Sequence, residues 1–257
     1  MILVCDVGNT ETTIGVYEGE TLRAHWRIMT DVPRTADEYG LLLRQLLIDE
    51  GINPTHIVGA AIASVVPRVT APMVDACKAW LQDRPVLTVD GRSKLPITLD
   101  VEEPQTVGAD RIVNTLAASQ LFKRDAIVVD LGTATTFDCI TSDGVFLGGA
   151  IAPGVLVMAE SLVRRTAKLP ATELVLPKKV IARRTEECIR AGVMYGAADA
   201  IDGMVRRIKK EWPRSETPLV IATGGLSETF QPICREINEI DPYLTLRGLQ
   251  LAYELLV

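Results

Sequence analysis

Residues 126–138 read A-I-V-V-D-L-G-T-A-T-T-F-D, and this stretch decides the fold. It begins with the apolar run Ile127 to Val129, a composition typical of a strand buried on both faces. Asp130 follows at once, and Gly132 comes two residues later in a turn rich in hydroxyl groups. A carboxylate at the end of a buried strand, beside a glycine that lets backbone approach a ligand, suits phosphate or metal chemistry. Taken alone, the stretch fits a plain β-hairpin whose turn starts with Asp at least as well.

The same motif stands at the start of the chain. Residues 2–10 read I-L-V-C-D-V-G-N-T, which places Asp6 over Asp130 and Gly8 over Gly132. The aspartates stand at positions 6 and 130 of a chain of 257 residues, so the copies begin about half a chain apart. A period this long excludes a solenoid and indicates two similar halves.

Each copy continues into a second β-like segment, residues 13–17 and 137–140, and then into a polar turn that contains glycine. Apolar patterns of strands and helices alternate through the rest of both halves, which predicts an α/β fold. We place the two domains at residues 1–118 and 119–257.

The composition excludes several classes of protein. Hydrophobic residues make up 47% and charged residues 23%, which is ordinary for a soluble globular chain. The net charge of −6, without a long basic run, argues against a nucleic-acid partner. No apolar run approaches the ~20 residues of a membrane span. The five cysteines are scattered and form no C-x-x-C pair, so we expect reduced thiols and a cytoplasmic location.

A third aspartate lies in the sequence Gly108-Ala109-Asp110-Arg111, where a helical pattern begins. An N-cap or first-turn acid is the simpler interpretation on spacing alone, because Asp is common there. The alternative is a catalytic base, held on a rigid element and aimed into a cleft between the domains.

Three further segments contain glycines, and one of them has a polar residue where a helix is expected to begin. Residues 148–154 read G-G-A-I-A-P-G and predict a backbone-exposing loop, either a plain turn or a substrate loop. A helix is expected from Thr185 to about Trp212, and its glycines indicate a tight helix–helix contact, which could be a subunit interface, or a break. Residues 218–226 form a last buried strand that ends in Thr223-Gly224-Gly225.

The common nucleotide and hydrolase signatures are absent from the sequence. There is no G-x-x-x-x-G-K-[ST] and no G-x-G-x-x-G after a strand, which excludes a P-loop and a Rossmann dinucleotide site. There is no G-x-S-x-G, and neither histidine has a plausible nucleophile, which argues against serine or cysteine hydrolysis.

The remaining motifs resemble those of the acetate and sugar kinase/Hsp70/actin superfamily and, in detail, the type III pantothenate kinases. Five of the family's motifs stand in order over nearly the whole chain: Asp6 to Thr10, Gly108 to Arg111, Asp130 to Asp138, Gly148 to Gly154, and Thr223 to Gly225. The resemblance implies duplicated ribonuclease H-like (actin-like ATPase) domains with mixed sheets flanked by helices and an interdomain ATP cleft. It also implies ATP-dependent phosphorylation of pantothenate, the first step of coenzyme A synthesis, by a homodimer.

The resemblance implies roles for individual residues. It assigns ATP binding to Asp6, Val7, Gly8, Asn9, Thr10, Glu11, Thr12, Thr13 and Thr133, with Asp6 near the ATP-bound Mg²⁺. It assigns the general base to Asp110, and substrate binding to Gly108, Ala109, Asp110, Arg111 and Thr185. Asp130 is the implied ligand of a monovalent cation, K⁺ or NH₄⁺.

One position departs from the family. A tyrosine that contacts pantothenate often stands seven residues before the glycine of G-A-D-R, and this chain has Val101 there. A kinase for another small alcohol therefore stays open as an alternative. So does a non-catalytic regulator of the same fold, although that interpretation predicts the loss of Asp110 or Asp130, and both are present.

Overall fold

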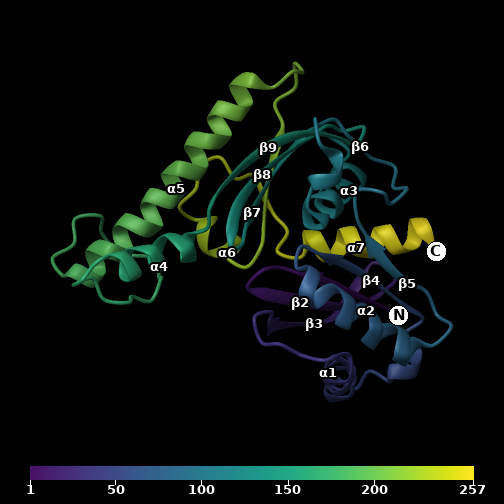
Figure 1. Ribbon diagram of the computed structural model, residues 1–257. Coiled ribbons are helices and arrows are strands. Elements are labelled where there is room, and N and C mark those ends of the chain that lie inside the picture. Colours follow the sequence, from purple (N-terminus) through teal and green to yellow (C-terminus); the bar gives the residue numbers. More distant parts are fainter. The chain divides into compact units, whose positions relative to one another are not determined.

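The computed structural model describes residues 1–257. In it the two Asp-x-Gly motifs lie in β-hairpins of two separate sheets (Figure 1). Contacts divide the chain into unit 1, Met1–Leu121 with Leu244–Val257, and unit 2, Phe122–Tyr243. The predicted domains, residues 1–118 and 119–257, assign the C-terminal segment to the second half instead. The physical reason for the difference is an apolar C-terminal helix that packs on the sheet of unit 1.

The sheet of unit 1 has the strand order β3-β2-β1-β4-β5. Its strands are β1 (Ile2–Val7), β2 (Glu11–Glu18), β3 (Thr21–Met29), β4 (Gly59–Ser64) and β5 (Val86–Val89). Because β1 is antiparallel to β2 and parallel to β4, the sheet is mixed, as expected. Every residue of β1 is buried except Asp6, which is half-buried.

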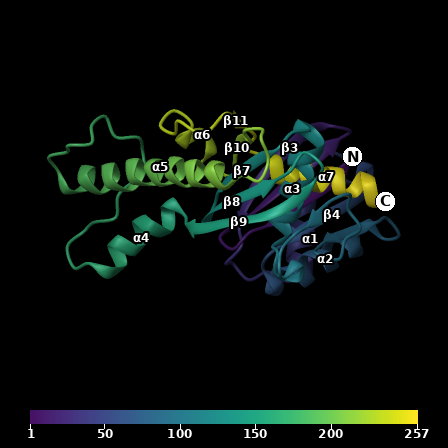
Figure 2. The same cartoon turned by 90° about the horizontal axis from the view of Figure 1, so that it is seen from above.

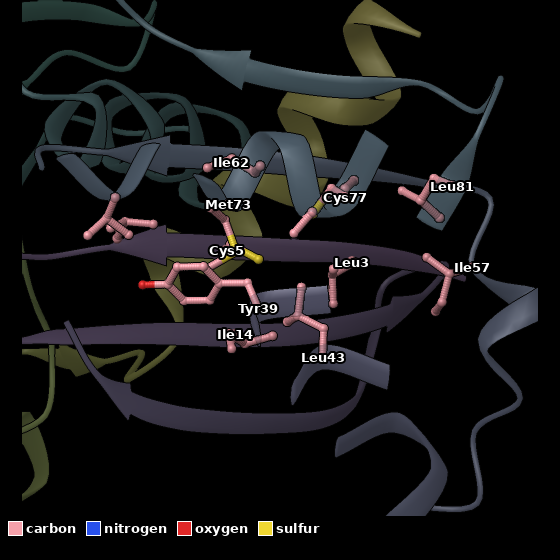
Figure 3. Packing of buried hydrophobic residues seen from close by; sticks show 14 of the residues in the cluster. Leu3, Cys5, Ile14, Tyr39, Leu43, Ile57, Ile62, Met73, Cys77 and Leu81 are labelled. Atoms are coloured by element: carbon pink, nitrogen blue, oxygen red, sulfur yellow. The ribbon is translucent and has the colours of Figure 1, made fainter. Parts of the chain in front are cut away.

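Helices α1 (Ala36–Asp49) and α2 (Pro67–Leu81) cover one face of this sheet. Figure 3 shows the core that they form with the strands, including Leu3, Cys5, Ile14, Tyr39, Leu43, Met73 and Cys77. The start of α1 is fixed as the sequence predicts. The Glu38 amide donates to the Thr35 hydroxyl at 3.3 Å, and the Thr35 amide donates to the Glu38 carboxylate at 2.7 Å.

Helix α7 (Leu244–Leu256) lies on the opposite face of the same sheet. A Cβ atom on Gly15 of β2 would lie 2.9 Å from Leu246 Cδ1 and 3.1 Å from Val4 Cγ2. Side chains alternate along a strand, so Asp6 lies on the same face of β1 as Val4. The remaining elements of unit 1 are η1 (Pro54–His56), β6 (Thr98–Leu99), η2 (Pro104–Thr106) and α3 (Ala109–Phe122).

In unit 2 the strand order is β11-β10-β7-β8-β9. The strands are β7 (Ala126–Leu131), β8 (Ala134–Ile140), β9 (Val145–Pro153), β10 (Leu219–Thr223) and β11 (Glu239–Ile240). β7 is antiparallel to β8 and parallel to β10. The predicted loop at residues 148–154 is wrong, because β9 continues to Pro153 and pairs with β8 throughout. Gly148, at φ +98°, adopts a turn-like backbone conformation within the strand.

The helices of unit 2 are α4 (Val155–Arg165), α5 (Thr185–Glu211) and α6 (Ser227–Phe230). Figures 1 and 2 both show α4 beside the long helix α5. α5 has the predicted extent and is unbroken through Gly192, Gly196 and Gly203. A Cβ atom on any of these glycines would meet nothing within 4 Å, so none of them serves a close contact within this chain.

All five cysteines are free thiols, and only Cys188 is exposed. None of the helices is both long and apolar enough to cross a lipid bilayer. The cytoplasmic location expected from the cysteine pattern stays a prediction.

Candidate functional site

The β1–β2 turn is braced by backbone and hydroxyl contacts. The Gly8 amide donates to Glu11 O at 3.1 Å, and the Thr30 amide donates to Thr10 O at 2.9 Å. The hydroxyls of Thr12 and Thr30 share a hydrogen bond of 2.8 Å, and both residues are fully buried. These contacts join the turn to its own second strand and to the residue after β3.

Burial separates the predicted ATP-binding residues of this hairpin into two groups. Val7 and Thr12 have buried side chains, so only their backbone can reach a ligand. Asn9, Thr10 and Glu11 are exposed at the tip of the turn. The other members of the predicted set, Asp6, Gly8 and Thr13, are half-buried.

The β7–β8 turn has the same plan but is one residue shorter. The Gly132 amide donates to Ala134 O at 3.1 Å, where the first hairpin joins Gly8 to Glu11. As a result Asp6 pairs with Thr13 across the first hairpin, and Asp130 pairs with Thr136 across the second. The shorter turn leaves Thr133 exposed at its tip.

The late Thr223-Gly224-Gly225 turn closes on Asp130. Thr223 pairs with Asp130 across the parallel strands β10 and β7. Gly224 has φ +85°, and a Cβ atom there would lie 2.5 Å from Asp130 Oδ1 and 2.9 Å from both N and O of Leu131. Only glycine fits this close approach of backbone to a carboxylate. The Ser227 hydroxyl donates to Gly224 O at 2.8 Å and fixes the turn.

Asp110 lies in the first turn of α3, as predicted. Its Oδ1 accepts a hydrogen bond of 2.8 Å from the Arg111 amide, so the role of a first-turn acid is present in the geometry. A side chain on Gly108 would collide with the Asp110 carboxylate, which explains why glycine stands there. Burial raises the pKa of Asp110 above its usual value, although the Arg111 amide and the Arg111 charge act in the opposite direction.

Asp110 and the β1–β2 turn both lie near the carboxyl ends of strands β1 and β4 in the unit 1 sheet. Val7 pairs with Ser64 at the ends of the parallel strands β1 and β4, and the Val65 amide donates to Val7 O at 3.1 Å. A Cβ atom on Gly108 would lie 3.4 Å from Val65 Cγ1. The carboxyl ends of parallel strands are where α/β proteins bind ligands.

No motif in the sequence singles out Val65, the residue that follows β4. Val65 is the link between the first hairpin and the Gly108 segment. Ser64, beside it, accepts a hydrogen bond of 2.7 Å from the Thr70 hydroxyl. The available signal is a strand of small residues that ends in Ser64, at the position where neighbouring carboxyl strand ends meet.

Thr185 is the first residue of α5 and is exposed. It makes no cap, because the N-cap position is Arg184, which has no side-chain capping bond. The opposite end of α5 is tied to the sheet, since the Trp212 indole donates to Asp125 Oδ2 at 2.9 Å. The predicted contact of Thr185 with substrate stays a prediction.

The sequence comparisons point to one family. The pattern of the family described as type III pantothenate kinase matches residues 2–207. A protein named type III pantothenate kinase from Moorella thermoacetica is 44% identical over 255 residues, 99% of each chain. Proteins of the same name from Anaeromyxobacter dehalogenans and Syntrophus aciditrophicus are 43% and 44% identical, again over 99% of each chain.

Solved structures share the fold at low sequence identity. A conserved protein from Campylobacter jejuni, assigned to the Baf family of transcriptional activators, has a TM-score of 0.61 at 18% identity over 98% of both chains. The ROK hexokinase from Thermus thermophilus has a TM-score of 0.51 at 12% identity over 98% of this chain and 97% of its own. These likenesses confirm the predicted α/β fold of the actin-like ATPase and sugar kinase type.

Proposed function

The chain belongs to the type III pantothenate kinase family, and from this premise we propose how its residues divide the work of the reaction. The enzyme uses ATP to phosphorylate pantothenate, the first step of coenzyme A biosynthesis. One observation carries the proposal: the braced β1–β2 turn and Asp110 both lie near the carboxyl ends of the parallel strands of one sheet. A phosphate-binding turn and a proton acceptor side by side are what phosphoryl transfer to an alcohol requires.

Asp110 acts as the general base in this proposal. Its carboxylate accepts the proton of the pantothenate hydroxyl while the hydroxyl oxygen forms its bond to the γ-phosphorus and ADP leaves. The start of a helix holds the carboxylate in place, and Gly108 leaves the space that the carboxylate needs. The partial burial that raises its pKa makes Asp110 a stronger proton acceptor than an exposed aspartate.

The acid side of the pH profile tests this role. The pKa of Asp110 is raised, and a base works only when deprotonated, so kcat/KM should fall as the pH falls through that raised pKa. We expect the inflection above the value of about 3.9 found for unperturbed Asp. A profile that stays flat down to that value, in an enzyme that remains folded, would exclude Asp110 as the base.

The β1–β2 turn holds the phosphates of ATP. Its exposed tip can donate hydrogen bonds from Asn9 and Thr10, whereas Val7 and Thr12 contribute backbone alone. Thr133, exposed at the tip of the β7–β8 turn, is the ATP contact proposed in unit 2.

The residues present fit Mg²⁺ bound mainly by the nucleotide. No group of three or more His, Cys, Asp or Glu side chains is placed to hold a metal. A single carboxylate near the phosphates, Asp6, suits Mg²⁺, because this ion retains several waters and phosphate oxygens as ligands. When bound, the ion neutralises charge on the transferred phosphoryl group.

Asp130 is proposed to hold a monovalent cation, K⁺ or NH₄⁺. The space beside Oδ1 is kept by Gly224, where a Cβ atom would lie 2.5 Å from that oxygen. Asp130 and the Leu131 carbonyl supply oxygen atoms, the donors that hard cations prefer. The residues therefore fit a cation without a dedicated protein cage.

Substrate binding is assigned to the segment before α3 and to α5. Ala109 is buried, so it contributes backbone alone, whereas Arg111 is half-buried and carries a charge that suits the pantothenate carboxylate. Val101 is half-buried and cannot donate the hydrogen bond that a tyrosine would give. Thr185 is proposed as a further contact.

A homodimer is supported by two exposed features of unit 2. Gly192, Gly196 and Gly203 lie along α5 with open space above them. Large apolar side chains are also exposed on α4 and in the segment before α5. Among them, Leu156 is 48% exposed and Ile181 is 88% exposed. A stripe of glycines lets a second helix approach closely, and the apolar side chains would leave water on association.

Replacing Gly196 with arginine tests the dimer. A long charged side chain on the open glycine stripe should block the approach of a second α5, so the variant should sediment with the mass of one chain while the wild type sediments as two. Gly40→Arg, on α1, is the matched control, because Gly40 also has nothing within 4 Å and lies outside the stripe. Equal masses for all three proteins would refute this interface.

A further inference from the structure

Helix α7 is distant in sequence from the proposed catalytic motifs. It nevertheless contacts both elements of unit 1 that carry these motifs, helix α3 and the sheet. One contact is with α3, the helix of Asp110. The Thr245 hydroxyl donates to Asn114 Oδ1 at 2.9 Å, and both residues are buried. Three residues further along α7, a side chain on Gly248 would collide with the Val113 carbonyl.

The other contact of α7 is with the sheet that carries Asp6. Leu246 lies against Gly15, and the Val4 side chain reaches the same point from the face of β1 that also carries Asp6. One to two turns further along, the Tyr253 hydroxyl donates to Val58 O at 3.3 Å, and a side chain on Gly59 would collide with the Tyr253 ring. α7 is therefore held against the sheet at both of its ends.

The contacts on α3 lie close to the proposed base. Val113 and Asn114 follow Asp110 by three and four residues, which places them one turn further along the same face of the helix. A shift of α7 would therefore move the first turns of α3 with respect to β1.

We propose that α7 is a positioning element for catalysis, and that Thr245 and Gly248 set the place of Asp110 relative to the β1–β2 turn. This inference rests on the proposed role of Asp110. Thr245 is buried and bonded to Asn114, so in this proposal it acts through Asn114 and α3 rather than by contact with a ligand. Phosphoryl transfer depends on positioning more than on covalent chemistry, so a small displacement of the base should lower the rate of the chemical step.

The test compares Thr245→Val, which removes the hydroxyl at nearly constant volume, with Thr245→Ser, which keeps it. We expect Thr245→Val to lower kcat by about tenfold or more, because small misplacements of reacting groups are that costly. The KM for ATP should stay unchanged, since the β1–β2 turn is intact. Thr245→Ser and Glu254→Gln, an exposed control on the same helix, should keep the wild-type kcat.

All assays are run well below the lowest melting temperature of the set. If Thr245→Val does not fold, Thr245→Ala removes the same hydroxyl without the added methyl group and is judged by the same criteria. A variant that melts earlier but keeps the wild-type kcat would overturn the proposal, because the contact would then serve stability alone.

A double variant separates this inference from the proposed base. If α7 acts through Asp110, then Thr245→Val should cause no further loss of kcat in an Asp110→Asn background. A full additional loss would overturn the positioning role. Failure of the base assignment shows differently: Asp110→Asn alone would then keep the wild-type kcat.

Discussion

Asp110→Asn should lower kcat by about 10²–10⁴-fold, the usual contribution of a positioned general base. Asparagine has nearly the same shape and can still accept the hydrogen bond from the Arg111 amide, so the start of α3 should be preserved. What it loses is the ability to take a proton from the substrate hydroxyl. Initial rates at saturating ATP and pantothenate measure the effect.

Stability measurements guard against a loss through unfolding. Burial raises the pKa of Asp110, so the folded state holds a proton there more tightly than the unfolded chain does. The stability from this group is fully present below its unfolded pKa and is lost as the pH rises through its folded pKa. The asparagine side chain that replaces Asp110 carries no charge at neutral pH, so the variant should melt no earlier than the wild type.

An exposed aspartate in the segment before α3 provides the matched control. Asp100→Asn makes the same chemical change on an exposed side chain and should leave kcat unchanged. If folded Asp110→Asn turns over at nearly the wild-type rate, the base must be another residue.

Asp130→Ala should abolish activation by K⁺. In the proposed role this carboxylate is the only charged protein ligand of the cation, and its removal leaves carbonyl oxygens without a counter-charge. We expect the wild-type rate to rise with added KCl at constant ionic strength, whereas the rate of the variant should not respond. Titrations of KCl against a salt of a large organic cation measure this difference.

Glu228→Ala is the control for Asp130→Ala. Glu228 is an exposed carboxylate on α6, directly after the Gly224 turn, so its loss changes the local charge without touching the proposed cation position. This variant should keep the wild-type K⁺ activation curve. An unchanged curve in Asp130→Ala would contradict the cation role, whatever the absolute rate.

The duplicated hairpins could be predicted from the sequence because their signals are local. Apolar runs that end in Asp-x-Gly determine β1 and β7, and the strands have the predicted spacing, Ile2–Val7 and Ala126–Leu131. The difference of one residue between the two turns was not visible, because both turns consist of glycine and hydroxyl residues.

The place of the C-terminal helix could not be predicted locally. Its amphipathic pattern indicates a buried face but not the partner of that face. That partner is a sheet whose strands lie more than half a chain away, and the contact depends on the absence of a side chain at Gly15 and Gly59. The predicted loop at residues 148–154 failed for a related reason: glycines and proline suggest turns, but pairing with β8 continues β9 through them.

Asp110 shows how far the residues alone lead. Its spacing fits a first-turn acid, and the structure retains that contact with the Arg111 amide. Asp110 is partly buried, and the segment that carries it lies close to Val65 and the first hairpin. Both features come from tertiary packing, which no local pattern reveals. Family membership gives the reaction, and the partial burial of Asp110 supports the proposal that it is the base.

The most direct test of the proposed activity is a coupled assay of ADP release with ATP and pantothenate, run beside a panel of sugars and small alcohols, with and without K⁺. We expect ADP release with pantothenate, a faster rate with K⁺, and only background release with the panel. Faster ADP release with one of the other alcohols, or no release with pantothenate under any condition, would contradict the proposed activity.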